Sequence, residues 1–243
     1  MKIGVQMYSI RNVTSQDMER ALQRVAEIGY EGIEFAGFYD YKADEILSWL
    51  KKYNLEVLGA HVSTEMILDQ PDETIEFHKR IGNKRIICPG FEGMKTKEGV
   101  LDFAKRLAAV IPKYHQAGMR LYYHNHAFEF TKEGEDYLID VLFDQVELLS
   151  PEFDIFWVYA GGECPVDYLN KYQGKTDIVH IKDGIGNTAT LLGKGEVNLE
   201  GVCSIIKKHH YKWAVVESES SDEMNEQIQA IKYDFGILKE LLK

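Results

Sequence analysis

Cysteine and proline are scarce in this chain of 243 residues, which has 3 cysteines and 5 prolines. Cys88, Cys164 and Cys203 are odd in number and far apart, which argues against a disulfide framework and leads us to expect a cytoplasmic protein. No run of about 18 apolar residues is present, so we expect no transmembrane helix. The opening MKIGVQMYSI alternates like a strand and lacks the apolar core of a signal peptide.

Positive charge is also scarce. The chain has 28 Lys and Arg against 39 Asp and Glu, for a formal net charge of −11, and its longest basic stretch is 207–210. Nucleic acids and anionic membranes are bound by concentrated basic surfaces. We therefore expect neither as a partner.

What the sequence does contain is a regular alternation of short apolar runs and longer amphipathic segments. Its 12% aromatic residues provide material for a core, which excludes a disordered chain. The runs that predict strands are Lys2–Met7, Gly32–Phe35, Glu56–His61, Arg85–Cys88, Arg120–His124, Phe153–Trp157, Ile178–Ile181 and Ala214–Glu217. The segments that predict helices are Ser15–Ile28, Ala43–Tyr53, Pro71–Ile81, Lys97–Ala117, Tyr137–Leu149, Val166–Tyr172, Leu199–His209 and Asp222–Leu242, the first with Ser15 as its N-cap.

Eight strand–helix pairs in this length favour one α/β architecture. Strict alternation requires a parallel sheet, and eight units fit a closed (β/α)8 TIM barrel. An open doubly wound sheet usually has a glycine-rich phosphate turn after its first strand, and MYSIR at 7–11 is not one. With no linker or change of composition, residues 1–243 are predicted to form a single domain with short βα loops.

Polar residues collect at the predicted strand ends, where a barrel of this type carries its chemistry. They are Glu34, His61, His124, His126, Asp154, His180, Lys182, Asp183 and Glu217. Singly, His61 or His126 reads most simply as a hydrogen-bonded rim residue, Glu34 as half of an ion pair, and Lys182 with Asp183 as an exposed loop pair. Asp154, His180 and Glu217 occupy equivalent heights on three successive strands, however, and buried carboxylates and imidazoles need a partner. Together the residues suggest a divalent metal site.

The ordered motifs resemble the sugar phosphate isomerase/epimerase family of the xylose-isomerase-like TIM barrels. Those motifs are GVQMYSIR, GYEGIEFAGF, LGAHVS, ICPG, HNHAFEF, FDIFWV with AGGECPVDYL, VHIKD and VVES, and they span the chain. The resemblance implies one divalent metal ion, most often Mn and in some members Zn, Co or Mg. It places Asp154, His180 and Glu217 among the ligands. The fourth position is commonly Glu in the epimerases; here His124 stands in register, with His126 as the alternative ligand.

That substitution bears on the expected mechanism. Two glutamates flank the sugar carbon in the epimerases of the family, and His124 removes one of them. We expect proton abstraction beside a sugar carbonyl through a metal-stabilised enediolate, with Glu217 as the leading base. Glu34 and His61 are further acid–base candidates, and His61 or Lys182 is the candidate proton donor or oxygen ligand. The predicted substrate contacts are Tyr8, Phe35, Asn125, His126, Phe128, Trp157 and Asp183.

Several functions remain open at this point. The same enediolate chemistry supports a keto-sugar lyase or dehydratase, and a non-catalytic sugar-binding barrel is a further alternative. Abasic-site endonucleases share the barrel, but they need more His and Glu ligands and basic DNA-binding loops, and the net charge of −11 and the short βα loops expected here argue against this function. The expected partner is a small sugar or keto-sugar, and the resemblance is compatible with a homodimer or homotetramer.

Overall fold

Eight parallel strands close into a barrel at the centre of the molecule. The computed structural model describes residues 1–243, and the order around the barrel is β1-β12-β9-β8-β5-β4-β3-β2. The barrel strands are β1 (Lys2–Gln6), β2 (Gly32–Phe35), β3 (Glu56–His61), β4 (Arg85–Cys88), β5 (Arg120–His124), β8 (Ser150–Asp154), β9 (Ile178–Ile181) and β12 (Trp213–Val216). The predicted single-domain (β/α)8 TIM barrel is confirmed.

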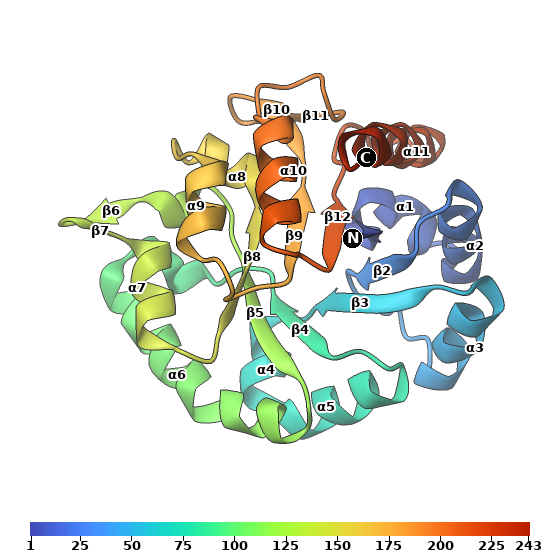
Figure 1. The fold of residues 1–243 in the computed structure, drawn as a ribbon. Coiled ribbons are helices and arrows are strands. Elements are labelled where there is room, and N and C mark those ends of the chain that lie inside the picture. The colour runs from blue at the N-terminus through green and yellow to red at the C-terminus, as the bar shows by residue number, and fades with distance from the viewer.

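Helices surround the barrel on its outside (Figure 1). The main helices are α2 (Met18–Ile28), α3 (Ala43–Tyr53), α5 (Pro71–Arg80), α6 (Lys97–Gln116), α7 (Leu138–Gln145), α9 (Pro165–Lys171), α10 (Leu199–Lys208) and α11 (Met224–Leu241). No helix combines the length and apolar character needed to cross a membrane.

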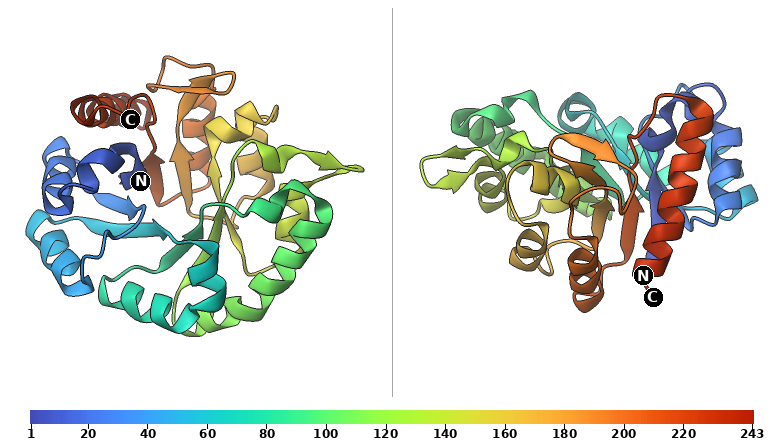
Figure 2. Two further views of the ribbon diagram at one scale, coloured as in Figure 1. Left: turned by 180° about the vertical axis from the view of Figure 1, so that it is seen from behind. Right: turned by 90° about the horizontal axis from the view of Figure 1, so that it is seen from above.

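Shorter elements fill several βα connections. They are the 3-10 helices η1 (Met7–Ile10), η2 (Glu92–Lys95) and η3 (Phe128–Phe130), the helices α1 (Arg11–Thr14), α4 (Thr64–Asp69) and α8 (Ile155–Ala160), and the hairpins β6 (Lys132–Glu133)–β7 (Asp136–Tyr137) and β10 (Asp183–Ile185)–β11 (Thr188–Thr190). Figure 2 shows the β6–β7 hairpin projecting away from the barrel. The prediction of uniformly short βα loops was therefore wrong at these two hairpins.

The sixth barrel strand differs most from its prediction. It occupies Ser150–Asp154, whereas the apolar pattern predicted Phe153–Trp157. The chain turns into α8 directly after Asp154 because this carboxylate accepts the amide hydrogens of Phe156 and Trp157, at 2.9 and 3.1 Å. The apolar run that resembled a strand is thus half strand and half helix.

Other corrections are smaller. The N-cap of α2 is Asp17, whose carboxylate accepts the amide hydrogen of Arg20 at 2.9 Å, and the predicted Ser15 lies before it. β12 ends at Val216, so Glu217 follows the strand instead of closing it. α7 ends at Gln145, well before the predicted Leu149.

The barrel interior changes from apolar to polar along the strands. Side chains alternate between the two faces of a strand, so residues two apart share the interior. On β9, Ile178 is followed by His180, and on β5, Tyr122 is followed by His124. The apolar layer consists of Leu58, Ile87, Tyr122, Ile178, Trp213 and Val215. Gly32 makes room for it, because a Cβ there would lie 2.6 Å from the Trp213 ring and 2.9 Å from a backbone oxygen.

An ion pair closes the opposite, N-terminal end of the interior. Arg85 donates to both carboxylate oxygens of Asp177, from Nε at 3.2 Å and from Nη2 at 2.6 Å. The Tyr122 hydroxyl donates to the same carboxylate at 2.9 Å. Burial alone would raise the pKa of Asp177, but Arg85 holds it well below its usual range. This pair ties β4, β5 and the start of β9 together.

Candidate active site

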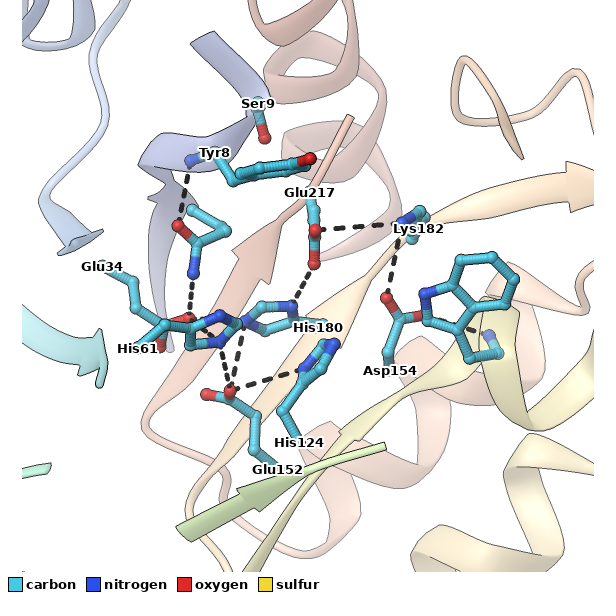
Figure 3. A network of polar contacts seen from close by, with 12 residues as sticks. Tyr8, Ser9, Glu34, His61, His124, Glu152, Asp154, His180, Lys182 and Glu217 are labelled. Atoms are coloured by element: carbon cyan, nitrogen blue, oxygen red, sulfur yellow. Dashed lines mark hydrogen bonds and ion pairs between the residues drawn. The ribbon is translucent and has the colours of Figure 1, made fainter. Parts of the chain in front are cut away.

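The polar end of the barrel interior carries two overlapping groups of side chains whose types and spacing could hold a metal ion (Figure 3). The upper group is His124, Asp154, His180 and Glu217. The lower group is His61, His124, Glu152 and His180. In each group, one ligand atom per residue lies within 4.8 Å of all the others. Two histidines belong to both groups, so the groups are stacked and joined.

His180 links the two groups through opposite edges of its ring. Its Nδ1 lies 2.7 Å from Glu217 Oε2, and its Nε2 lies 2.8 Å from Glu34 Oε1. Glu152 Oε2 is 3.5 Å from the same Nε2. Burial alone would lower the pKa of His180, but Glu152 and Glu34 hold it well above its usual range. The ring is therefore fixed from both sides.

Lys182 lies between the two carboxylates of the upper group. Its Nζ is 3.9 Å from Asp154 Oδ2 and 3.8 Å from Glu217 Oε1, and it also contacts Glu219. Burial disfavours the ammonium, yet Glu217 and Asp154 keep the pKa of Lys182 above its usual range. In return, Lys182 and His180 hold the pKa of Glu217 well below its range despite burial. Glu217 is accordingly an ionised carboxylate.

Asp154 gives the clearest indication of a cation. One of its oxygens caps α8, while the buried Oδ2 has no hydrogen-bond partner. Burial raises the pKa of Asp154 to about 7, although Lys182 opposes the rise. Two carboxylates and two imidazoles within this distance are donors that Mn²⁺ and Zn²⁺ accept. The upper group therefore fits a divalent ion.

Glu34 and His61 form the far wall of the lower group. His61 Nε2 lies 3.1 Å from Glu34 Oε1 and 3.2 Å from Glu152 Oε2. Burial lowers the pKa of His61, but the carboxylates outweigh it and raise the value to about 9. Gln6 Nε2 donates to Glu34 Oε1 at 2.7 Å. Glu34 is fully buried, so it meets other side chains and not the solvent.

The two predicted fifth-strand ligands differ in position. His124 ends β5 as the register partner of Glu152 and is buried, and its pKa is held well below the usual range by burial and by His180. His126 lies in the following loop, with its ring 5.9 Å from the parallel Phe128 ring. The upper and lower groups contain His124 and not His126.

A cavity of about 590 Å³ opens above these groups. Its lining residues are Tyr8, Ala36, Gly37, His61, Ser63, Pro89, His124, His126, Trp157, Glu217 and Glu219. Six predicted site residues are among them: Tyr8, His61, His124, His126, Trp157 and Glu217. The predicted residues Glu34, Asp154, His180 and Lys182 lie beneath the cavity in the buried network.

Four predicted substrate contacts are placed elsewhere. Phe35 is fully buried and packs on Phe38, with ring centroids 5.0 Å apart. Phe128 stacks behind His126, and the Asn125 side chain accepts the Asp154 amide hydrogen at 3.1 Å. Asp183 faces the following loop, where it accepts backbone amide hydrogens from Gly184, Gly193, Gly195 and Val197 at 2.9 to 3.1 Å.

Sequence reasoning missed three polar residues of the site, namely Gln6, Glu152 and Glu219, and one buried carboxylate outside it, Glu129. Glu152 lies two positions before Asp154 on β8 and so shares its interior face; a correct strand boundary would have shown this. Glu129 is buried below the rim, where the Tyr123 hydroxyl and the His126 amide donate to it, both at 2.8 Å. Burial raises the pKa of Glu129 to about 7.

Comparison with known proteins identifies the family of the fold. Residues 22–241 match the family described as xylose isomerase-like TIM barrel. The chain belongs to the xylose isomerase-like TIM barrel family. Among curated relatives, the inosose dehydratase of Clostridium botulinum is 25% identical, over 88% of this chain and 86% of the relative.

Several solved structures share the fold over the whole chain. A sugar phosphate isomerase/epimerase from Parabacteroides distasonis has a TM-score of 0.86 at 22% identity, covering 100% of both chains. The IolI protein, solved with a bound zinc atom, has a TM-score of 0.76 at 15% identity, covering 100% of this chain and 98% of its own. Proteins similar to this chain thus include isomerases, epimerases and a dehydratase.

Proposed function

We propose that this protein is a divalent-metal-dependent sugar isomerase or epimerase that removes a proton from the carbon beside a carbonyl. The observation that carries this proposal is Glu217, an ionised carboxylate that lines the cavity and belongs to a buried group of four ligands. A carboxylate beside a cation, at the floor of a cavity of this size, suits deprotonation of a small polyhydroxy ketone.

The upper group would hold the ion through His124, Asp154, His180 and Glu217. A divalent cation there supplies Lewis acidity, which polarises a carbonyl and favours loss of the neighbouring proton. Mn²⁺ is the expected ion, and Zn²⁺ is the main alternative because the structurally similar IolI protein binds zinc.

The remaining roles belong to side chains around the cavity. Glu217 accepts the proton, and Lys182 keeps its carboxylate ionised through their 3.8 Å contact. His61 lines the same cavity, and because its carboxylate neighbours favour the imidazolium, it can return the proton. Trp157 and Tyr8 provide flat walls against which a sugar ring can pack.

The charge of the lining favours an unphosphorylated substrate. The lining contains two carboxylates, Glu217 and Glu219, and no arginine or lysine. Lys182 lies below, engaged by three carboxylates, and Arg11 near the rim pairs with Asp222. A phosphate group would meet negative charge without a free cationic side chain.

Dehydration of a keto-sugar or keto-cyclitol is the second candidate. A curated relative is an inosose dehydratase. In addition, imidazoles of His61 and His126 line the cavity together with the base Glu217, and the second lining carboxylate, Glu219, is paired with Lys182. That arrangement suits loss of a proton from carbon and of a hydroxyl group as water.

The test is carbon-bound hydrogen exchange in D2O, followed by NMR, with the Mn²⁺-loaded protein. The panel pairs keto-sugars and cyclitol ketones with their phosphorylated counterparts. We expect exchange with an unphosphorylated ketone; an isomer as product identifies an isomerase or epimerase, and loss of 18 mass units identifies a dehydratase.

Glu217→Gln is expected to lower the exchange rate about 10²- to 10⁴-fold while circular dichroism stays unchanged. Glu200→Gln, an exposed carboxamide substitution on α10, is the matched control. Unchanged exchange in the Glu217 variant would refute the assignment of the base. Absence of both exchange and bound metal in the unaltered protein would instead indicate a non-catalytic barrel.

A further inference from the structure

Glu34 receives three side-chain donors on a single carboxylate oxygen. Gln6 Nε2 lies 2.7 Å from Oε1, His180 Nε2 lies 2.8 Å from it, and His61 Nε2 lies 3.1 Å from it. Glu34 is fully buried and does not line the cavity. These contacts place it beneath the upper group, out of reach of a substrate.

The contacts give the two edges of His180 different roles. Nε2 faces Glu34, whereas Nδ1 faces Glu217 in the upper group. A neutral imidazole carries one N–H and one lone pair, and an ionised carboxylate can only accept. Nδ1 also faces an ionised carboxylate, Glu217 at 2.7 Å, so both nitrogens carry a proton in the imidazolium; a divalent ion would displace the proton on Nδ1, while Glu34 would hold the proton on Nε2.

We propose that Glu34 is a positioning residue that fixes His180 as the Nε2–H tautomer and thereby directs Nδ1 to the divalent ion. This inference rests on the proposed function, because it presupposes an ion in the upper group. Carboxylates that accept the second N–H of a ligating histidine orient the ring and increase its basicity. Glu34 thus acts through His180 and does not itself touch the substrate.

The support for Glu34 continues into the neighbouring strand. Gln6 and Glu34 are register partners on β1 and β2, so their side chains enter the interior side by side. Gln6 Oε1 accepts the Tyr8 amide hydrogen at 3.0 Å, which orients the Gln6 amide with its Nε2 toward Glu34. A chain of hydrogen bonds therefore runs from the start of η1 through Gln6 and Glu34 to His180.

Glu152 defines the competing arrangement. Its Oε2 lies 3.2 Å from His61 Nε2, 3.5 Å from His180 Nε2 and 3.6 Å from His124 Nδ1. Were an ion to bind in this lower group, His180 would coordinate it through Nε2. The shorter 2.8 Å contact between Nε2 and Glu34 favours a hydrogen bond at that edge instead.

The first experiment reads the tautomer directly. The protein labelled with 15N-histidine is loaded with Zn²⁺, and long-range 1H–15N correlations of His180 are assigned by their loss in His180→Gln. The expected spectrum shows a protonated Nε2 and a zinc-bound Nδ1. Zinc on Nε2, or a proton on Nδ1, would overturn the inference without any substitution at Glu34.

The second experiment measures zinc affinity by competition with a chromogenic chelator. Glu34→Gln is expected to weaken binding about 10- to 100-fold, and Gln6→Leu, which leaves the Glu34 carboxylate in place, is expected to weaken it by a smaller factor. Glu129→Gln is the matched control, because Glu129 is equally buried but bonds to Tyr123 and a backbone amide. It should stay within about twofold of the unaltered protein.

Equal affinities of the Glu34 and Glu129 variants would refute the positioning role. Two zinc ions per chain, one of them lost in Glu152→Gln, would also refute it, because His180 would then coordinate through Nε2. Absence of zinc binding by the unaltered protein would refute the proposed function and this inference together. Binding that does not respond to Glu34→Gln overturns the inference alone.

Discussion

His78 on α5 makes a sharp prediction about stability and pH. It is 1% exposed and lies against the rings of Phe38 and Phe77, with centroid distances of 5.4 and 5.6 Å. Asn83 donates from Nδ2 to its Nδ1 at 2.9 Å and is itself oriented by two bonds to the backbone of Arg85. A protonated ring would lose this acceptor, so His78 folds as a neutral imidazole.

The magnitude follows from the two protonation equilibria. Burial lowers the pKa of His78 from 6.5 to about 4 in the folded protein. Between these values the unfolded chain binds the proton and the folded chain does not, so stability falls as pH decreases through 6.5 and levels off below about 4. From pH 7.5 to pH 5 this group alone costs about 2 kcal/mol.

Urea unfolding followed by circular dichroism at pH 7.5, 6 and 5 measures the effect. His78→Gln removes the titration, so its stability should fall about 2 kcal/mol less than that of the unaltered protein over this interval. Other groups titrate in both proteins and cancel in the difference. His210→Asn, at an exposed position with a left-handed φ of 56° that asparagine accepts, should keep the original slope.

If the free energy of unfolding of the His78 variant fell with pH as steeply as that of the unaltered protein, this reasoning would be refuted, because the folded protein would then accommodate the imidazolium. A reduced slope in the His210 variant as well would show that the effect does not depend on burial.

Two further predictions concern opposite ends of the barrel. Asp177→Asn leaves Arg85 without its carboxylate partner at a site where both side chains are 16% exposed. We expect urea titrations at pH 7 to show a free energy of unfolding lower by about 3 kcal/mol. A loss below about 1 kcal/mol would contradict a role of this ion pair in closing the barrel. Trp157→Ala removes the ring that lies 4.9 Å from Lys182 Nζ. This substitution should raise KM about tenfold for the substrate identified by hydrogen exchange, and Trp157→Phe should restore most of the affinity. An unchanged KM in the alanine variant would show that Trp157 is not a wall of the substrate cavity.

The sequence was sufficient to predict the barrel because its signals are local. Strands such as Gly32–Phe35 and Ile178–Ile181 are bounded by turns and differ sharply from the amphipathic helices between them. The strand prediction at 153–157 was wrong for a reason that is also local, because an apolar run alone does not distinguish a buried strand from a buried helix. The cap made by Asp154 decides that case, and it depends on hydrogen bonds within the folded turn.

The residue types of the candidate site could be predicted from the sequence, whereas the depth of each residue in the barrel could not. Asp154, His180 and Glu217 were recognisable as polar residues at the ends of successive strands, but their predicted equivalent heights hold only for the register partners Asp154 and His180, since Val215 pairs with His180 and Glu217 follows β12. Whether a polar strand residue faces the cavity or lies beneath it depends on the closed register, as in the pairing of Gln6 with Glu34. That pairing joins segments 28 residues apart in the chain, and no local pattern specifies it.

The loop closed by Asp183 has a consequence for the cost of substrate binding. Lys182 immediately precedes this carboxylate, which gathers four backbone amides from 184–197. The conformational entropy of that segment is therefore given up during folding and not when a substrate arrives. When a substrate binds, the contacts of Lys182 are therefore not weakened by an entropic cost of ordering the loop that follows it.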